Sequence, residues 1–178
     1  MTEQYYTHIY PHLIGSISIW GTDDPHRAYI QPLIRIHKRI IRYICRSPPR
    51  AHTQPLMNRL HILSITNLYI LRTAVEMHHI RSTANENRPD HVHHYVQTSS
   101  QHRYQTRFSQ RKTNYIPSNS KNQRSKMNPF AREYSRIWNE LPSDLREIDS
   151  TSELKDKLKT FLLAKQSGFN IPGNLLRD

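Results

Sequence analysis

The sequence predicts an all-α protein, with a small helical domain, a long polar connector that is partly disordered, and a C-terminal helix pair. Apolar residues recur at helical spacing in several stretches, and the 11 prolines imply frequent interruptions between short elements. The four glycines are few for an all-β protein. From residue 82 to 128 the periodicity is lost, and polar and basic residues predominate. The expected regions are 1–81 (N-terminal helical region), 82–128 (connector), 129–167 (helix pair) and 168–178 (tail).

Composition limits the cellular setting and the size of the core. The chain has 178 residues, long enough to bury a core, but the apolar fraction of 35% is low, which fits a partly solvated chain. Its single cysteine, Cys45, excludes an intramolecular disulfide and fits a reducing compartment. The N-terminus lacks a signal-peptide pattern, and the longest apolar stretch, residues 13–20, is too short to span a bilayer. We expect an intracellular protein, nuclear or cytoplasmic and not secreted, with no membrane partner.

The clearest helix is expected at residues 30–46. It follows an aromatic stretch at 4–20, expected as one helix or two short ones broken around Pro11, and a turn at 21–25. At about 100° per residue, one side of the helix carries its apolar residues and a histidine. These are Ile30, Leu33, Ile36, His37, Ile40, Ile41 and Ile44. The opposite arc carries the cations Arg35, Lys38, Arg39, Arg42 and Arg46.

Two further helices are expected before the connector, a short one at residues 55–63 and a longer one at 65–80. Ser64 or Thr66 has the side chain to cap the longer helix. Its inward face is expected to hold Leu68, Leu71 and Val75.

The C-terminal pair begins at Asn128-Pro129, a favourable N-cap followed by proline at the first helical position. The first helix runs to Pro142, and its apolar stripe is Phe130, Tyr134, Ile137, Trp138 and Leu141. Trp138 and the Leu141-Pro142 corner are expected to be the packing centre. This pair is too small to form a stable core alone, so we expect it to dock on the N-terminal helices.

Capping signals place the last two elements. Ser143 is expected to cap a short turn, and Ser150 with Glu153 has the spacing of a capping box. The final helix follows with the stripe Leu154, Leu158, Phe161 and Leu162. Gly168 is placed to close it in a left-handed conformation.

The charge distribution indicates a polyanionic partner. The chain has 26 Lys and Arg against 14 Asp and Glu, a net charge of +12. No acidic residue occurs from residue 26 to 58, so pairing along the helix cannot explain the basic arc at 35–46. We interpret the arc as a phosphate-binding surface of low sequence specificity, for RNA or DNA, with a solvated basic face as the alternative. The connector adds the candidate contacts Arg103, Arg107, Arg111 and Lys112, interleaved with aromatic residues.

Other chemistry finds little support. The adjacent aspartates Asp23 and Asp24 precede a proline and indicate a turn rather than a metal-binding hairpin. No catalytic residue, metal site or cofactor is predicted, because the histidines have no Cys-x-x-Cys partner and Cys45 no catalytic neighbours. Those histidines are His78, His79, His91, His93 and His94. Both tryptophans, Trp20 and Trp138, fall on the apolar phase of their segments and are interpreted as core anchors.

Five segments occur in an order that resembles one protein family. They are "IYPHLIGSISIWG", "IRIHKRIIRYICRSPPRAHTQPLMNRLHILSITNLYILRTAVEMHHI", "QTR", "REYSRIWNELPSDLREI" and "DSTSELKDKLKTFLL". Together they resemble the C-terminal region, thumb-like or beyond the thumb, of reverse transcriptases from non-LTR (LINE-type, jockey-like) retrotransposons. The sequence departs from that pattern at His37, where glutamine is usual, and at Ser16 to Ser18, which replace a more aromatic run.

The resemblance implies a region that grips template–product duplex or element RNA without reading bases, originally beside an upstream polymerase core. The paired aspartates of that family's Tyr-x-Asp-Asp turn have no counterpart here. We therefore expect a truncated, non-enzymatic fragment that binds nucleic-acid backbones. The alternatives are a helical protein-interaction or scaffold module, and a decayed retroelement remnant with no selected role.

Overall fold

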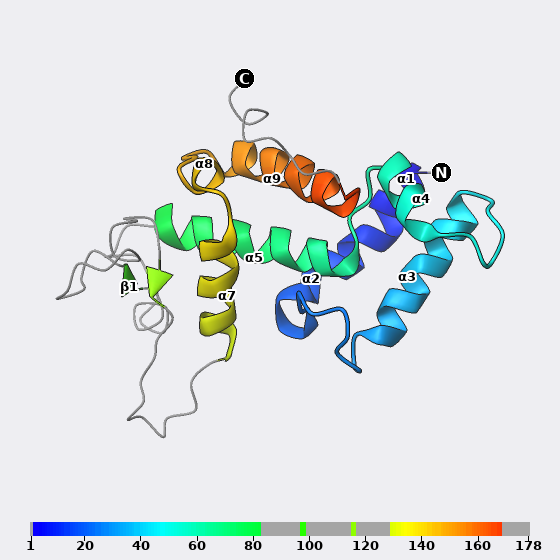
Figure 1. Cartoon of the computed structure of the whole chain (residues 1–178), viewed down its shortest axis with the longest axis horizontal. Helices are drawn as coiled ribbons and strands as arrows, with labels where there is room; N and C mark the ends of the chain where they lie inside the picture. The colour runs from blue at the N-terminus through cyan, green and yellow to red at the C-terminus, as the bar shows by residue number, and fades with distance from the viewer. Residues whose placement is uncertain (1, 83–96, 99–114, 117–128, 169–178) are drawn as a thin grey trace. The chain divides into compact units, whose positions relative to one another are not determined.

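The structure is a computed structural model, and it describes residues 2–82, 97–98, 115–116 and 129–168 (Figure 1). Within those residues it is helical, which confirms the predicted fold class. Two strands of two residues each, β1 (Gln97–Thr98) and β2 (Tyr115–Ile116), form an antiparallel pair. The other residues expected in the connector, 83–96, 99–114 and 117–128, lie outside the described part, and so does the expected cap Asn128.

The chain forms two compact units. The first comprises Met1–Arg72 together with Asp156–Asp178, and the second comprises Thr73–Lys155. Helices α5 (Ile65–Ser82) and α9 (Thr151–Gln166) each contribute residues to both units.

The N-terminal segment of the first unit changes helix type before its proline. A short α1 (Thr2–Gln4) leads into a π-helical turn, η1 (Tyr5–Ile9), and then into α2 (Tyr10–Trp20). The backbone N–H of Tyr10 donates to the carbonyl of Tyr5, a wider turn than in an α-helix. Pro11 has no N–H to donate, and its ring displaces the carbonyl four residues earlier, so the regular pattern is broken there. The chain nevertheless stays helical from Thr2 to Trp20, so the outcome is one helical segment with a change of helix type just before Pro11, not two separated helices.

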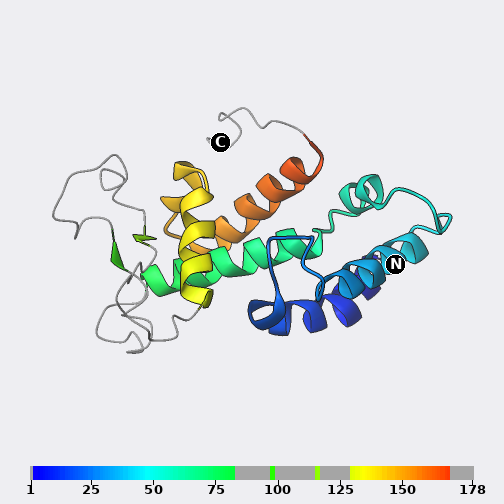
Figure 2. The same ribbon diagram turned by 60° about the horizontal axis from the view of Figure 1, so that its bottom comes forward.

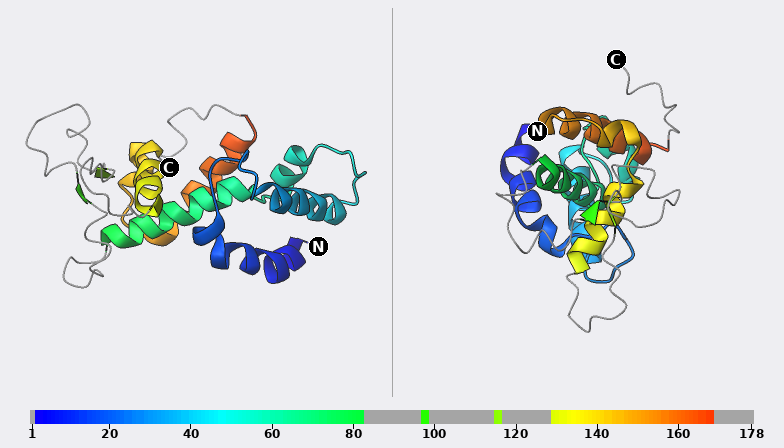
Figure 3. Two further views of the ribbon diagram at one scale, coloured as in Figure 1. Left: turned by 90° about the horizontal axis from the view of Figure 1, so that it is seen from below. Right: turned by 90° about the vertical axis from the view of Figure 1, so that its left-hand side faces the viewer.

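Helices α3 (Gln31–Ile44) and α4 (Thr53–Arg59) follow in the same unit. The N-terminal segment runs beside α3 in Figure 2 and in the left view of Figure 3. The Tyr5 hydroxyl and His37 Nε2 join the two at 2.9 Å. Helix α4 begins two residues earlier than expected and ends at Arg59, because His61 adopts a left-handed φ of 52°.

Helix α5 is buried on several sides rather than on one stripe. Leu68 and Leu71 are buried as expected, whereas Val75 is only half-buried. Tyr69, Ala74 and Met77 point in other directions around the helix and are also buried. Of the two candidate caps, Ser64 is the one used: its Oγ accepts the N–H of Asn67 at 3.3 Å.

The second unit contains α7 (Pro129–Glu140) and α8 (Ser143–Arg146), packed with the C-terminal part of α5. Figures 1 and 2 show α7 crossing that part of α5, and the Tyr134 hydroxyl donates to Glu76 Oε2 at 2.8 Å. Trp138 is fully buried and Leu141 is 6% exposed, which confirms the expected packing centre. The Phe130 side chain lies outside the described residues. The expected docking of the pair on an N-terminal helix is thus realised through α5.

Of the predicted helix caps and closures in the C-terminal elements, one is wrong, one is half-formed and one is confirmed. Ser143 does not cap α8: Pro142 occupies the N-cap position, and the Ser143 hydroxyl donates to Asp144 Oδ1 instead. Ser150 Oγ accepts the N–H of Glu153 at 3.5 Å, one half of the expected capping box. Gly168 has φ +75°, as expected for the closure of α9. The stripe residues Leu154, Leu158 and Leu162 of α9 are buried, and Phe161 is half-buried.

Candidate nucleic-acid interface

Helix α3 carries the candidate interface, and both of its ends are set by local sequence. Pro32 lies in its first turn, where a missing N–H costs nothing. At the other end, Arg46 takes a left-handed φ of 50°. The N–H of Arg46 donates to the carbonyl of Tyr43 and that of Ser47 to the carbonyl of Arg42, which is the Schellman closure. The helix therefore ends at Ile44. The spacing predicted that Arg46 belongs to the basic arc of the helix, and that prediction was wrong.

The inward face of α3 is anchored by Ile30, Ile41 and His37, all buried. Burial lowers the pKa of His37 to about 4, so its imidazole is neutral near pH 7. Burial also raises the pKa of Tyr5, which keeps the phenol protonated beside it. The predicted inward face was wrong at one position, because the Ile36 side chain is 54% exposed.

Three of the five predicted cations form one surface. Arg35, Arg39 and Arg42 recur at every third or fourth residue, so they share one side of α3; we call them the arginine face. The side chains of Arg35 and Arg39 are exposed, and Arg42 is half-buried. Arg42 Nε donates to the carbonyl of Ala51 at 2.9 Å, which ties the loop after α3 back to the helix.

The remaining predicted cations lie elsewhere. Lys38 lines a separate hollow of about 390 Å³ with Gln54 and Lys165. Arg46 is exposed in the turn beyond the helix. Arg103, Arg107, Arg111 and Lys112 lie outside the described residues.

A hollow of about 520 Å³ lies at the arginine face. Arg35, Arg39 and Arg42 line it together with Ile36, Tyr43 and Pro49. Tyr43 is 85% exposed, the largest value among the exposed large apolar side chains that are described. Sequence reasoning did not single out Tyr43, although its place within a run of arginines on α3 was a usable signal.

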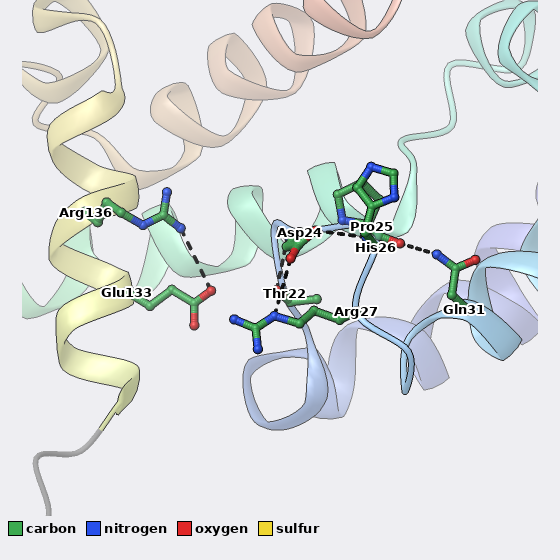
Figure 4. Close-up of polar contacts among 8 residues, drawn as sticks. All are labelled: Thr22, Asp24, Pro25, His26, Arg27, Gln31, Glu133 and Arg136. Atoms are coloured by element: carbon green, nitrogen blue, oxygen red, sulfur yellow. Dashed lines mark hydrogen bonds and ion pairs between the residues drawn. The ribbon is translucent and has the colours of Figure 1, made fainter.

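The electrostatic surroundings of the arginine face are one-sided. The sequence has no Asp or Glu from residue 25 to 75, and among the described residues no carboxylate pairs with these three arginines. Arg136 in α7 differs, because it lies 4.0 Å from Glu133 (Figure 4). It also lies 2.9 Å from Glu140. The arginine face therefore keeps its positive charge available to an external anion.

The nearest preceding acid in sequence, Asp24, is engaged within its own turn. Its Oδ1 accepts the N–H of His26 at 2.9 Å, and its Oδ2 lies 3.4 Å from Arg27 Nε (Figure 4). Its own N–H donates to Thr22 Oγ1 at 3.1 Å. This is the turn expected after Trp20, with the carboxylate used to hold the backbone.

The histidine, cysteine and tryptophan side chains that the sequence analysis considered make contacts within the fold. His78 Nε2 lies 2.8 Å from the carbonyl of Ile148, and its Nδ1 lies 3.0 Å from Thr151 Oγ1. The hydrogen bond to a carbonyl requires a proton on Nε2, and in the neutral imidazole Nδ1 then accepts from the hydroxyl. Cys45 is a half-buried free thiol, and Trp20 is half-buried whereas Trp138 is fully so.

Within the described ranges, no three His, Cys, Asp or Glu side chains gather in a way that suits a metal ion. His91, His93 and His94 lie outside those ranges. None of the described helices combines the length and the apolar character needed to cross a bilayer. Comparison of the chain with family models, with curated proteins and with solved structures finds no match.

Proposed function

We propose that the chain binds RNA or DNA through the phosphate backbone, with little dependence on sequence, by the arginine face of α3. The observation that carries this proposal is the alignment of Arg35, Arg39 and Arg42 on one side of a helix whose other side is anchored in a core. The helix rises about 1.5 Å per residue, so the three guanidinium groups leave the axis along roughly 10 Å. Such a row can meet successive phosphates.

The alternative of a merely solvated basic face is less favoured for two reasons. Solvated helix faces usually intersperse both charges, as Glu133, Arg136 and Glu140 do in α7. The arginine face has no acid among its near neighbours in sequence, and like charges placed so close repel each other. A bound anion would offset this repulsion between the three arginines.

On origin, we propose that the chain corresponds to the region that follows the polymerase core in non-LTR retrotransposon reverse transcriptases, and that it is not an enzyme by itself. The quoted sequence segments, which lie between residues 9 and 163, occur in the same order as in that family and support this proposal. The carboxylate of Asp24, one of its two adjacent aspartates, is used within a turn. Metal-dependent primer extension by the purified chain, lost on Asp24→Ala, would contradict the second part.

The nucleic-acid proposal is tested by the salt dependence of binding. Arg35→Gln with Arg39→Gln removes two exposed charges, whereas Arg42 is left in place because its Nε holds the loop. Affinity for a labelled 20-nucleotide RNA is measured by fluorescence anisotropy over a range of salt concentrations. Each lost phosphate contact lowers the slope of log affinity against log salt by about 0.7 for a single strand, so the double variant should lose about 1.4.

A matched control separates local contact from total charge. Arg59→Gln with Lys155→Gln removes the same two charges from exposed positions on α4 and α9. The control should keep nearly the full slope. Equal slopes for the arginine-face variant, the control and the parent chain, with helicity unchanged by circular dichroism, would exclude the arginine face as the contact.

The second candidate is a protein-interaction module. The exposure of Ile36 and Tyr43 on α3 favours it, because exposed apolar side chains often mark a partner surface. It predicts that removal of the arginine charges leaves the salt slope of RNA binding intact, which the same titration decides.

A further inference from the structure

Two apolar side chains lie beside the arginine face, on one flank of it. Tyr43 is 85% exposed and Ile36 is 54% exposed. They are seven residues apart on α3, two helical turns, and therefore lie on the same side. Single exposed apolar residues are common on protein surfaces, but this pair borders a hollow with the arginines.

The hollow gives the tyrosine ring a defined setting. Arg39 and Arg42 precede Tyr43 by four and one residues, and all three line the hollow. Pro49 lines it from the loop, and the bond from Arg42 Nε to the Ala51 carbonyl holds that loop to the helix. The site therefore combines an exposed aromatic face, two cations and a fixed wall of low polarity.

On the basis of the nucleic-acid binding proposed above, we propose that Tyr43 stacks on an unpaired base, and that the arginine face binds single-stranded nucleic acid in preference to duplex. A nucleotide presents a flat π face for the ring and a phosphate for the guanidinium groups beside it. Stacking of this kind accepts any base, because every base has a π face.

The preference for a single strand follows from what a duplex hides. In a duplex each base is already paired and stacked between its neighbours, so Tyr43 meets only sugar and phosphate at the surface. Bringing one base out of the stack is unfavourable, whereas an unpaired strand presents its bases without that cost. The arginines contact phosphates in both cases, but the ring contributes only with the single strand.

Charge decides against other occupants of the patch. A second copy of the chain would bring the same arginines against Arg35 and Arg39, and the sequence offers no nearby acid to offset them. An occupant that covers an aromatic ring beside a row of cations has to carry negative charge next to an apolar face. A single-stranded nucleic acid has both in every unit.

The test compares Tyr43→Leu with Tyr43→Phe in the full chain. Both variants keep an apolar side chain at an exposed position, so the fold is preserved, but only phenylalanine keeps the ring. Affinities are measured by anisotropy for a 20-nucleotide single-stranded RNA, a 20-base-pair duplex, and a sugar-phosphate strand without bases. Leucine should weaken binding to the single-stranded RNA about tenfold and phenylalanine hardly at all. Affinity for the duplex and for the base-free strand should stay unchanged in both.

Each other outcome overturns the assignment. If Tyr43→Leu lowers the affinity for all three ligands equally, the ring maintains the shape of the binding surface and does not stack on a base. An unchanged single-strand affinity, with the salt slope still lowered by the arginine substitutions, would refute the stacking role and leave the proposed function intact. An unchanged salt slope in the arginine variant would refute the proposed function itself. A concentration-dependent dimer that Tyr43→Leu abolishes would show that a second copy covers the patch.

Discussion

Gln166, the last residue of α9, is expected to be one of the largest polar contributors to the stability of the first unit. Its Oε1 accepts the N–H of Ser64 at 2.9 Å and Nδ2 of Asn67 at 3.1 Å. Its Nε2 donates to Asn58 Oδ1 at 3.0 Å and to the carbonyl of Ile62 at 3.3 Å. The side chain is 9% exposed, so water replaces these partners poorly. One amide thus joins α9 to the α4–α5 connection and to the start of α5.

The substitution Gln166→Leu keeps the approximate volume and removes all four hydrogen bonds. Each such bond stabilises the folded state by about 1 kcal/mol, and a buried group left without a partner costs about 1–3 kcal/mol. Asn67 and Asn58 are only partly buried and regain some hydrogen bonding to water. The expected loss in the free energy of unfolding is therefore about 2–4 kcal/mol.

Urea denaturation followed by circular dichroism measures this loss. Gln166→Glu is the informative companion, because it keeps the acceptors for Ser64 and Asn67 but loses the donors, and it should fall between the parent chain and the leucine variant. Lys165→Gln, at the neighbouring exposed position, should change stability by no more than about 0.5 kcal/mol. A loss below about 1 kcal/mol for Gln166→Leu would refute the claim that this amide holds the unit together.

Two further predictions concern stability. His37 has a pKa of about 4 in the folded protein, against an ordinary value of 6.5, so the unfolded chain binds more protons between these two pH values. The contribution of His37 to the free energy of unfolding is therefore complete above pH 6.5. It is lost as the pH falls towards 4, by up to about 3 kcal/mol. Thermal unfolding from pH 7.5 to 4.5 should show this loss, and a His37→Gln chain that loses stability just as steeply would contradict it. Trp138→Ala should cost about 3–5 kcal/mol because the indole is fully buried, and urea denaturation showing a loss under 1 kcal/mol would mean that the α7–α8 corner has another centre.

The sequence predicted what depends on local pattern. The 3.6-residue repeat located α3, α7 and α9, because each of these helices buries one face and its own sequence carries that pattern. Caps and closures with local geometry were also predictable, as Ser64 and Gly168 show. The turn at Asp24 belongs to the same group.

Features that depend on distant partners could not be predicted. The role of Gln166 requires Ser64, 102 positions earlier, and nothing in the local sequence of α9 distinguishes it from a solvated glutamine. Arg46 was expected on the helix because it continues the spacing of the basic arc. Its left-handed conformation is unfavourable for arginine, and the Schellman bonds to Arg42 and Tyr43 outweigh that cost. In the candidate site, the arginines were located from the sequence. The position of Tyr43 among them was a signal, but its exposed fraction was not predictable, because exposure depends on what the rest of the chain leaves uncovered.

Arg42 shows how the fold and the proposed interface are connected. Its Nε is used to hold the loop at Ala51, whereas the guanidinium has further N–H donors that a phosphate can use without breaking that bond. The loop that supplies Pro49 is therefore fixed before any ligand arrives, and its ordering does not have to be repaid on binding. On the opposite side of the same helix, the imidazole of His37 stays neutral because burial lowers its pKa. Helix α3 thus keeps charge out of its core and concentrates it on one outer face, which is the arrangement that a rigid backbone-binding helix requires.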